Sequence, residues 1–304
     1  MSSLAFSVSR PIEPLAESIK ALGLLRPLWL AQGVDNRPVV VSGGRRLSAL
    51  RLIKAEKIPC LPLTALNPSP DPTNLIKAAI TDNLERGLNQ AELSLAWDLV
   101  KREAPKEAWP EMASLLGFSL HGQKPLALEK AALLPKEALP LLAQGKLDPE
   151  NALVLADWPI PGQSLALGLI GRASPSKQNR RLWLEWLDDL RRAQGNGALL
   201  ETLSSPALKD LSGPLAEKMA RDHIRALRFP YLTKLERKRQ EILKSLALPE
   251  GFKLELDPNF EDVSATIKIT FSDALELKSL ATVALSLARE DTLERLWALR
   301  DPAS

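Results

Sequence analysis

An apolar run that breaks at two adjacent glycines constrains the start of this chain more than any other feature. The run at residues 38–41 precedes Gly43 and Gly44, and apolar residues then recur at helical spacing as far as Ile53. A short run of branched apolar residues is typical of a strand, and paired glycines at its end are typical of a turn. The pattern therefore predicts a strand that turns directly into a helix.

The same alternation of short elements continues on both sides of this turn as far as Gly87. The predicted helices cover residues 15–22, 45–54 and 75–84, and the predicted strands cover residues 28–30, 37–41 and 58–63. Helices and strands that alternate over so short a length pack as one α+β domain. We expect that domain over residues 1–87.

After Gly87 the sequence becomes helical almost throughout. Helices predicted over residues 110–116 and 126–134 flank the turn at Gly117, which is the helix-turn-helix arrangement of DNA-binding proteins. Residues 253–256 and 265–271 alternate with period two, as antiparallel strands do, and helices are predicted over residues 274–288 and 292–299. We expect a helix-turn-helix domain over residues 88–160, a mostly α, partly basic region over 161–248 and a small α/β module over 249–304.

Composition excludes several classes of protein. The chain has 304 residues, 45% of them hydrophobic and 25% charged, and contains no run of about 18 uncharged apolar residues that could span a bilayer. Because its N-terminus also lacks a secretory signal, we expect a cytoplasmic protein with no membrane role. The single cysteine, Cys60, excludes an intramolecular disulfide and a Cys-rich zinc site, and two histidines leave little for metal ligation. We predict no metal ligands.

The strand-to-helix turn offers the groups that a phosphate requires. Backbone N–H groups at Gly43 and Gly44 can approach an anion closely, and the start of the following helix adds its positive end. Arg45 and Arg46 supply forked donors for phosphate oxygens. The alternative is a glycine turn with two solvated arginines, and the Gly-Lys-Ser/Thr spacing of Walker-type loops is absent.

Two further segments are candidates for DNA contact. Short polar and basic residues at the start of a recognition helix are its usual contacts, and here they are Ser119, His121, Gln123 and Lys124. For His121 an exposed loop residue is the alternative. Residues 221–244 contain eight Lys/Arg and three Asp/Glu, whereas residues 245–304 contain six and eleven. Such a basic block can neutralise phosphates, although it can equally be a solvated helix face. Its candidates for DNA binding are Arg225, Arg228, Arg237, Lys238 and Arg239.

Several segments, taken in order, resemble the ParB partition family. They are Leu-Ala-Glu-Ser-Ile at residues 15–19, Gly-Leu-Leu-Arg-Pro-Leu at 23–28, Val-Val-Ser-Gly-Gly-Arg-Arg-Leu-Ser-Ala at 40–49, Asp-Asn-Leu-Glu-Arg at 82–86 and the segment 136–152. The resemblance extends over roughly residues 10–156, about half of the chain.

The resemblance implies a fold and a set of ligands. ParB proteins join an N-terminal domain of the ParB/sulfiredoxin type to a helix-turn-helix and bind centromere-like double-stranded DNA. Many bind CTP with Mg²⁺ and close into a sliding clamp. The resemblance therefore implies a homodimer, and it also implies a Walker-type partition ATPase as partner. By this resemblance the triphosphate would face Gly43, Gly44, Arg45 and Arg46, the base and ribose would lie near Arg26, and the metal-bound phosphates would lie near Asp82, Asn83 and Arg86.

Four departures from the family pattern bear on catalysis. Gly44 stands where the family has glutamate, and Ser48 where it has arginine. Arg26 stands where glutamine is common, and Asp82 has a shorter reach than the usual glutamate. Each change weighs against hydrolysis more than against binding, because hydrolysis requires a placed water and metal. We assign no catalytic residue and see no carboxylate cluster for a nuclease. The leading hypothesis is a nucleotide-binding, DNA-binding protein of partition or related DNA maintenance. The alternatives are a clamp that hydrolyses CTP and a non-enzymatic adaptor whose acidic C-terminal module recruits a partner.

Overall fold

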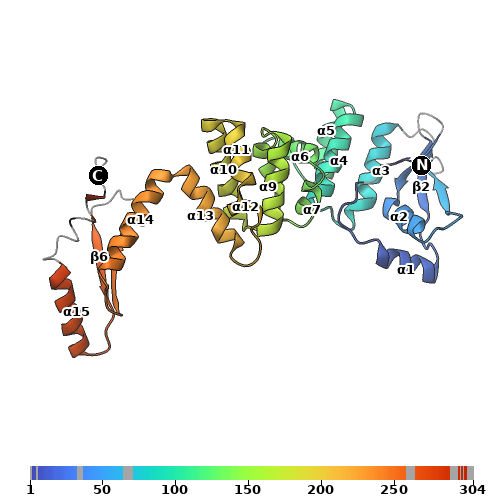
Figure 1. The fold of residues 1–304 in the computed structure, drawn as a ribbon. Helices are drawn as coiled ribbons and strands as arrows, with labels where there is room; N and C mark the ends of the chain where they lie inside the picture. The colour runs from blue at the N-terminus through green and yellow to red at the C-terminus, as the bar shows by residue number, and fades with distance from the viewer. Residues whose placement is uncertain are drawn as a thin grey trace. The chain divides into compact units, whose positions relative to one another are not determined.

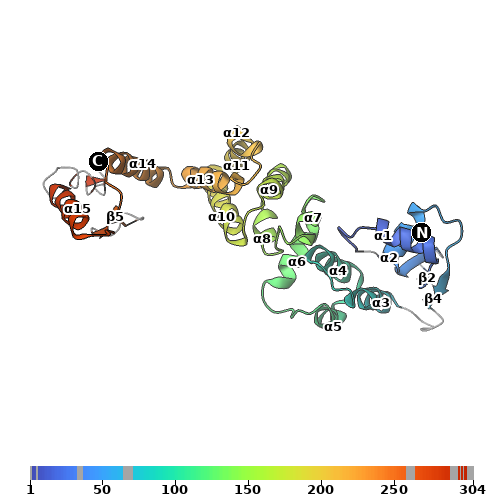
Figure 2. The ribbon, with the colours of Figure 1, turned by 90° about the horizontal axis from the view of Figure 1, so that it is seen from below.

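The computed structural model describes residues 2–4, 6–32, 37–63, 71–257, 264–287, 294, 296, 298 and 299. The described part is mostly helical and has two small sheets (Figure 1; Figure 2), which confirms the expected mixture of α and β structure. The chain divides into two units, residues 1–221 and 222–304. The boundaries expected after residues 87, 160 and 248 do not coincide with this division.

The first unit begins with a four-stranded sheet in the order β1-β3-β2-β4. β3 pairs antiparallel with β2 and parallel with β1, and β2 pairs parallel with β4. Successive residues of a strand face opposite sides of a sheet. Val40 therefore packs with Leu47 on one face, while Val41 joins the core on the other. The strands are β1 (Ser2–Ser3), β2 (Leu28–Gln32), β3 (Pro38–Ser42) and β4 (Cys60–Pro62).

Helices cover both faces of this sheet. α1 (Glu13–Leu22) and α2 (Gly44–Leu52) pack on each other through Ala16, Ile19, Ala49 and Leu50. α3 (Pro72–Leu84) contacts β3 from the other side and contributes Ile76 and Ile80 to the core that contains Val41. The strand-to-helix junction predicted at Gly43 and Gly44 is confirmed.

The sheet shares its core with the helices that follow. One cluster of buried side chains runs from Phe6 and Val41 of the sheet region through Trp97 to Met112 and Leu128. This continuous core explains why no division of the chain falls near residue 87. The helices concerned are α4 (Gln90–Glu103), a 3₁₀ turn (Lys106–Ala108), α5 (Trp109–Leu115) and α6 (Lys124–Leu133).

The remaining helices of the first unit pack side by side around a second set of buried side chains. α9 contacts both α7 and α11, and the prolines at residues 159 and 161 lie at its start. Trp183 is fully buried, as the helical spacing of the tryptophans predicts. These helices are α7 (Ala138–Ala143), α8 (Asn151–Leu155), α9 (Ile160–Ala173), α10 (Lys177–Gln194), α11 (Asn196–Ser204) and α12 (Pro206–Lys209). α13 (Ala216–Arg228) contains the division between the units.

The second unit contains two strands and a helix in the part of the chain, residues 249–304, where the sequence predicts a small α/β module. β5 (Phe252–Leu256) and β6 (Ala265–Ile269) pair antiparallel. α15 (Ala274–Leu287) packs Leu280 and Leu287 with Phe252, and α14 (Pro230–Ser245) supplies Leu235 and Ile242 to a neighbouring cluster. The helix expected over residues 292–299 lies mostly outside the described residues. Among the helices that the structure describes, none is long and apolar enough to cross a bilayer.

Candidate functional site

A cavity of about 280 Å³ lies where β3 ends and α2 begins. All eight residues that the sequence suggests for a nucleotide or phosphate line it, and they come from three separate segments: the loop before β2, the β3–α2 turn and the end of α3. They are Arg26, Gly43, Gly44, Arg45, Arg46, Asp82, Asn83 and Arg86. The fold therefore brings the predicted set together.

Gly43 makes the turn between β3 and α2 possible. Its φ of 97° is in the left-handed region, which side chains other than glycine rarely adopt. A Cβ at this position would lie 2.5 Å from Leu28 Cδ2, and Leu28 is fully buried. The first turn of α2 contains no acidic residue, so no side chain of that turn offsets the positive end of the helix.

The Arg46 guanidinium group makes several hydrogen bonds within the protein. Its Nη1 donates to the carbonyl oxygens of Arg26 at 3.0 Å and Pro27 at 2.7 Å, and its Nη2 donates to Ser42 Oγ at 3.1 Å. Asp82 Oδ2 lies 3.8 Å from Nη2. Burial lowers the pKa of Arg46, and the nearby Asp82 carboxylate acts in the opposite direction. Arg46 therefore ties the loop before β2 to the β3–α2 turn and is partly satisfied without a ligand.

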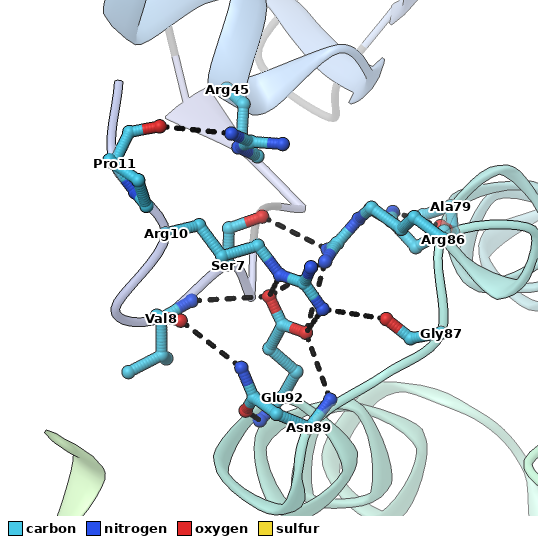
Figure 3. A network of polar contacts seen from close by, with 11 residues as sticks. Ser7, Val8, Arg10, Pro11, Arg45, Ala79, Arg86, Gly87, Asn89 and Glu92 are labelled. Atoms are coloured by element: carbon cyan, nitrogen blue, oxygen red, sulfur yellow. Dashed lines mark hydrogen bonds and ion pairs between the residues drawn. The ribbon is translucent and has the colours of Figure 1, made fainter. Parts of the chain in front are cut away.

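Arg45 has donor capacity to spare. Its Nη2 donates to the carbonyl oxygen of Pro11 at 3.0 Å, whereas its Nε is buried and has no hydrogen-bond partner in the described part of the chain. Burial, followed by the positive charges of Arg86 and Arg10, lowers the pKa of Arg45. Figure 3 shows Arg45 reaching the segment at Pro11 while Arg10 and Arg86 meet below it. Buried donors are nearly always paired in folded proteins, so Arg45 is the side chain of this site most suited to an added acceptor.

Arg86 and Asn83 hold each other in place at the end of α3. Arg86 Nε donates to Asn83 Oδ1 at 2.8 Å, and Asn83 Nδ2 donates to the carbonyl oxygen of Ala79 at 2.7 Å. Arg86 Nη2 also donates to Ser7 Oγ at 3.1 Å. Both cavity-lining side chains are therefore fixed before any ligand binds.

Glu92 is a buried charged residue next to the candidate site that the sequence-based site prediction omits. Its carboxylate is fully buried and accepts hydrogen bonds from Arg10 Nε at 2.9 Å, from Arg86 Nη1 at 2.9 Å and from the backbone N–H groups of Val8 and Asn89 (Figure 3). Burial alone would raise the pKa of Glu92, but the hydrogen bonds from Arg10, Asn89 and Arg86 outweigh it and the pKa lies below its ordinary value. The Asn-x-x-Glu spacing of a helix capping box was the available signal for this residue.

Three of the helix-turn-helix candidates lie on an eight-residue connection, residues 116–123, between α5 and α6, and the fourth, Lys124, is the first residue of α6. A typical helix-turn-helix turn has about three or four residues, so this one is irregular. Phe118 anchors it by packing edge-on against Trp97, with ring centroids 5.1 Å apart. The four predicted contact residues are exposed, and α6 presents the apolar Leu126 and Leu133 to solvent further along. They are Ser119, His121, Gln123 and Lys124.

Only some side chains of the basic block at residues 221–244 are available for DNA contact. Arg225 forms a two-bond pair with Glu236 at 2.6 and 2.9 Å. Arg239 Nη1 donates to the carbonyl oxygen of Asp257 at 2.7 Å, and the Arg228 guanidinium lies 4.8 Å from the ring centroid of Phe229. Arg237 is exposed, and Lys238 is half-buried.

No protein-family model matches the chain, and no curated protein matches it significantly. Among solved structures, the fold is similar to that of the C-terminally truncated chromosome-partitioning protein ParB from Caulobacter crescentus complexed to the centromeric parS site. The two share 19% sequence identity, and the match covers 60% of this chain and 94% of that chain at a TM-score of 0.31. An identity and a TM-score this low assign the chain to no family.

Proposed function

We propose that the protein binds double-stranded DNA and holds a nucleotide of the CTP type in the cavity at the start of α2. One observation carries the nucleotide site: eight residues chosen from the sequence line a single cavity. The lining of that cavity includes four arginines and only two carboxylates, Asp82 and Glu85. An excess of guanidinium groups beside a helix start favours a polyanionic ligand.

The residues present fit a triphosphate accompanied by Mg²⁺. The spare donors of Arg45 suit phosphate oxygens, and the half-exposed Asp82 offers the single carboxylate that Mg²⁺ often takes alongside substrate phosphates. Small-molecule pockets usually measure about 300–1,000 Å³. The cavity of about 280 Å³ therefore suits the phosphate end of a nucleotide more than the whole molecule.

DNA binding is supported by the exposed residues between α5 and α6 and by the sequence resemblance to ParB proteins. The two helices on either side of those residues share a core with the sheet of the nucleotide cavity. On this proposal the protein works as a homodimer in chromosome or plasmid partition or related DNA maintenance, with a Walker-type ATPase as its partner. Binding ranks above hydrolysis, because Asp82 and Glu85 are the only carboxylates on the cavity wall in the described residues.

The test is a calorimetric titration of the full chain with each of the four ribonucleoside triphosphates, with and without Mg²⁺ and duplex DNA. We expect CTP to bind and Arg45→Ala to weaken it by about 10-fold or more, the effect of roughly 1.4 kcal/mol. Arg51→Ala, an exposed arginine at the far end of α2, is the matched control and should leave affinity unchanged.

Each alternative gives a different result in the same samples. Release of phosphate from CTP would establish the hydrolysing clamp. Failure of every triphosphate to bind would reject the nucleotide site, and absence of DNA binding at low salt would reject the DNA-binding role. Partner capture with neither ligand bound would support the adaptor.

A further inference from the structure

We propose a second anion subsite on the opposite side of Arg45, in a separate cavity of about 400 Å³. Ser7, Gly44 and Arg45 line both cavities, so the Arg45 side chain forms part of the wall between them. The other five residues of the second cavity do not line the nucleotide cavity proposed above. The lining consists of Ser7, Ser9, Arg10, Pro11, Ile12, Gly44, Arg45 and Ser48.

Short side chains keep this cavity open. Gly44 has no side chain, and Ser48 has only a hydroxyl group, which donates to the carbonyl oxygen of Gly44 at 3.1 Å. Ser9 also lines the cavity and is exposed. Hydroxyl groups carry no charge and therefore do not repel an anion.

The local charge balance is positive. Arg10, Arg45 and Arg86 surround one buried carboxylate, Glu92, to which Arg10 and Arg86 are both bonded. Three guanidinium groups and one carboxylate leave two uncompensated positive charges. The lining of the second cavity contains no acidic residue, and Glu13, which accepts from the backbone N–H of Ile12, is not part of that lining. Electrostatics therefore favour an added anion here.

A buried donor without a partner is the second observation, and it is the same Arg45 nitrogen that the nucleotide cavity also offers. Arg45 Nε is one of four buried side-chain nitrogen or oxygen atoms that lack a hydrogen bond within the described ranges. A buried donor left unpaired costs about 1–3 kcal/mol, and an acceptor oxygen placed beside it would remove that cost. Arg45 is also the residue on which the two cavities meet.

The ligand that fits is a phosphate group. Its several acceptor oxygens can meet a guanidinium fork, serine hydroxyls and the start of α2 at the same time. The phosphate is either a free ion or a group of a nucleotide whose other phosphates occupy the first cavity. The chemistry of recognition is the same in both cases.

The test measures binding of inorganic phosphate to the full chain by calorimetry at physiological ionic strength. Ser48→Glu places a carboxylate in the second cavity only and should weaken phosphate binding by about 10-fold or more. Ser48→Ala should change it by less than about twofold, the usual range for a mild surface change. Asn83→Ala alters only the first cavity, so it should weaken CTP binding and spare phosphate binding.

The reverse pattern, with phosphate binding lost in Asn83→Ala and kept in Ser48→Glu, overturns the second subsite. So does an absence of phosphate binding, or binding that no variant changes. If Ser48→Glu fails to fold, Ser9→Asp introduces the charge from the other wall, because aspartate tolerates the φ of 52° at that position.

A titration of phosphate into protein saturated with CTP and Mg²⁺ distinguishes the two sources. Unchanged affinity indicates an independent ion, whereas competition indicates that the subsite takes a phosphate of the nucleotide. A protein that binds phosphate at Ser48 but no nucleotide would refute the proposed function and leave the subsite intact.

Discussion

One terminal nitrogen of Arg86 lies 2.9 Å from one carboxylate oxygen of Glu92 and 3.0 Å from the other. Solvent does not reach this carboxylate, which also binds Arg10 and the backbone of Val8. Because Arg86 lines the first cavity and Glu92 lies in the first turn of α4, a single ion pair joins the candidate ligand site to the helical part of the unit. Two predictions concern this pair.

Removal of the Glu92 carboxylate should cost more stability than its helix-capping role explains. Glu92→Ala leaves Arg10 and Arg86 without their shared partner, and breaking a buried pair from one side costs about 3–5 kcal/mol. Glu92→Gln should cost less, because glutamine can still accept from the backbone N–H of Asn89. Urea denaturation of the full chain measures the free energy of unfolding. Asn89→Ala weakens the cap and keeps the carboxylate, so a loss in that variant equal to that of Glu92→Ala would contradict the prediction.

The same carboxylate should make stability depend on pH in acid. The pKa of Glu92 lies below its ordinary value of 4.5 in the folded protein, so its contribution is complete above pH 4.5 and disappears as the pH falls through the lower folded value. The difference in unfolding free energy between the native chain and Glu92→Gln should therefore shrink below about pH 4.5. Denaturation curves over an acid pH series measure it, and a difference that stays constant would exclude Glu92 as the titrating group.

Local pattern was enough to predict the turn and its neighbours. The branched apolar run, the glycine pair and the helical spacing that follows them are local properties, and they located β3, Gly43 and α2. Family resemblance then identified residues 82–86 as part of the same site, and these residues do line the cavity with Arg45. Local pattern could not show which side chains of the site would already be hydrogen-bonded to other parts of the protein. Arg46 binds the carbonyl groups of Arg26 and Pro27, which only the tertiary structure brings within reach.

Packing between distant segments was the least predictable feature. Gly87 follows a helix that ends at Leu84, and Pro159 precedes one, so both positions are typical of a linker in a single sequence. Neither position could show that Val41 and Trp97 belong to one core, because that contact depends on side chains far apart along the chain. Glu92 was missed for a related reason, since its partner Arg10 precedes it by 82 residues.

Gly43 should tolerate no side chain. Gly43→Ala combines a left-handed φ with a clash against Leu28, and we expect it to cost about 2–4 kcal/mol. Gly23→Ala is the matched control, because Gly23 also has a positive φ but a Cβ there meets no atom within 4 Å. It should cost only about 1–2 kcal/mol. If urea denaturation gave equal losses of unfolding free energy for Gly43→Ala and Gly23→Ala, the close approach of Leu28 would not constrain the turn.

Substitutions at the two adjacent arginines should differ in their effects on stability and on CTP binding. Arg46→Ala removes hydrogen bonds to two carbonyl groups and Ser42, so it should lower the unfolding free energy by about 1–3 kcal/mol and weaken CTP binding as well. Arg45→Ala removes one exposed bond and an unpaired buried donor, so it should weaken binding with little loss of stability. Thermal melting and calorimetry on the same samples measure both effects. Equal destabilisation by the two variants would refute this division of roles.

The basic block should contribute to DNA binding through its exposed members only. Arg237 is exposed, whereas Arg225 already holds both oxygens of Glu236. A lysine or arginine that neutralises one DNA phosphate steepens the dependence of log affinity on log salt by about 0.9. Arg237→Ala should reduce the slope by about that amount, while Arg225→Ala should change it much less, because an arginine whose terminal nitrogens are engaged with a carboxylate is not available to neutralise a phosphate. Titrations of labelled duplex DNA at several salt concentrations measure the slope. A larger change in Arg225→Ala than in Arg237→Ala would mean that DNA displaces Glu236, and that the ion pair is itself part of the DNA-binding surface.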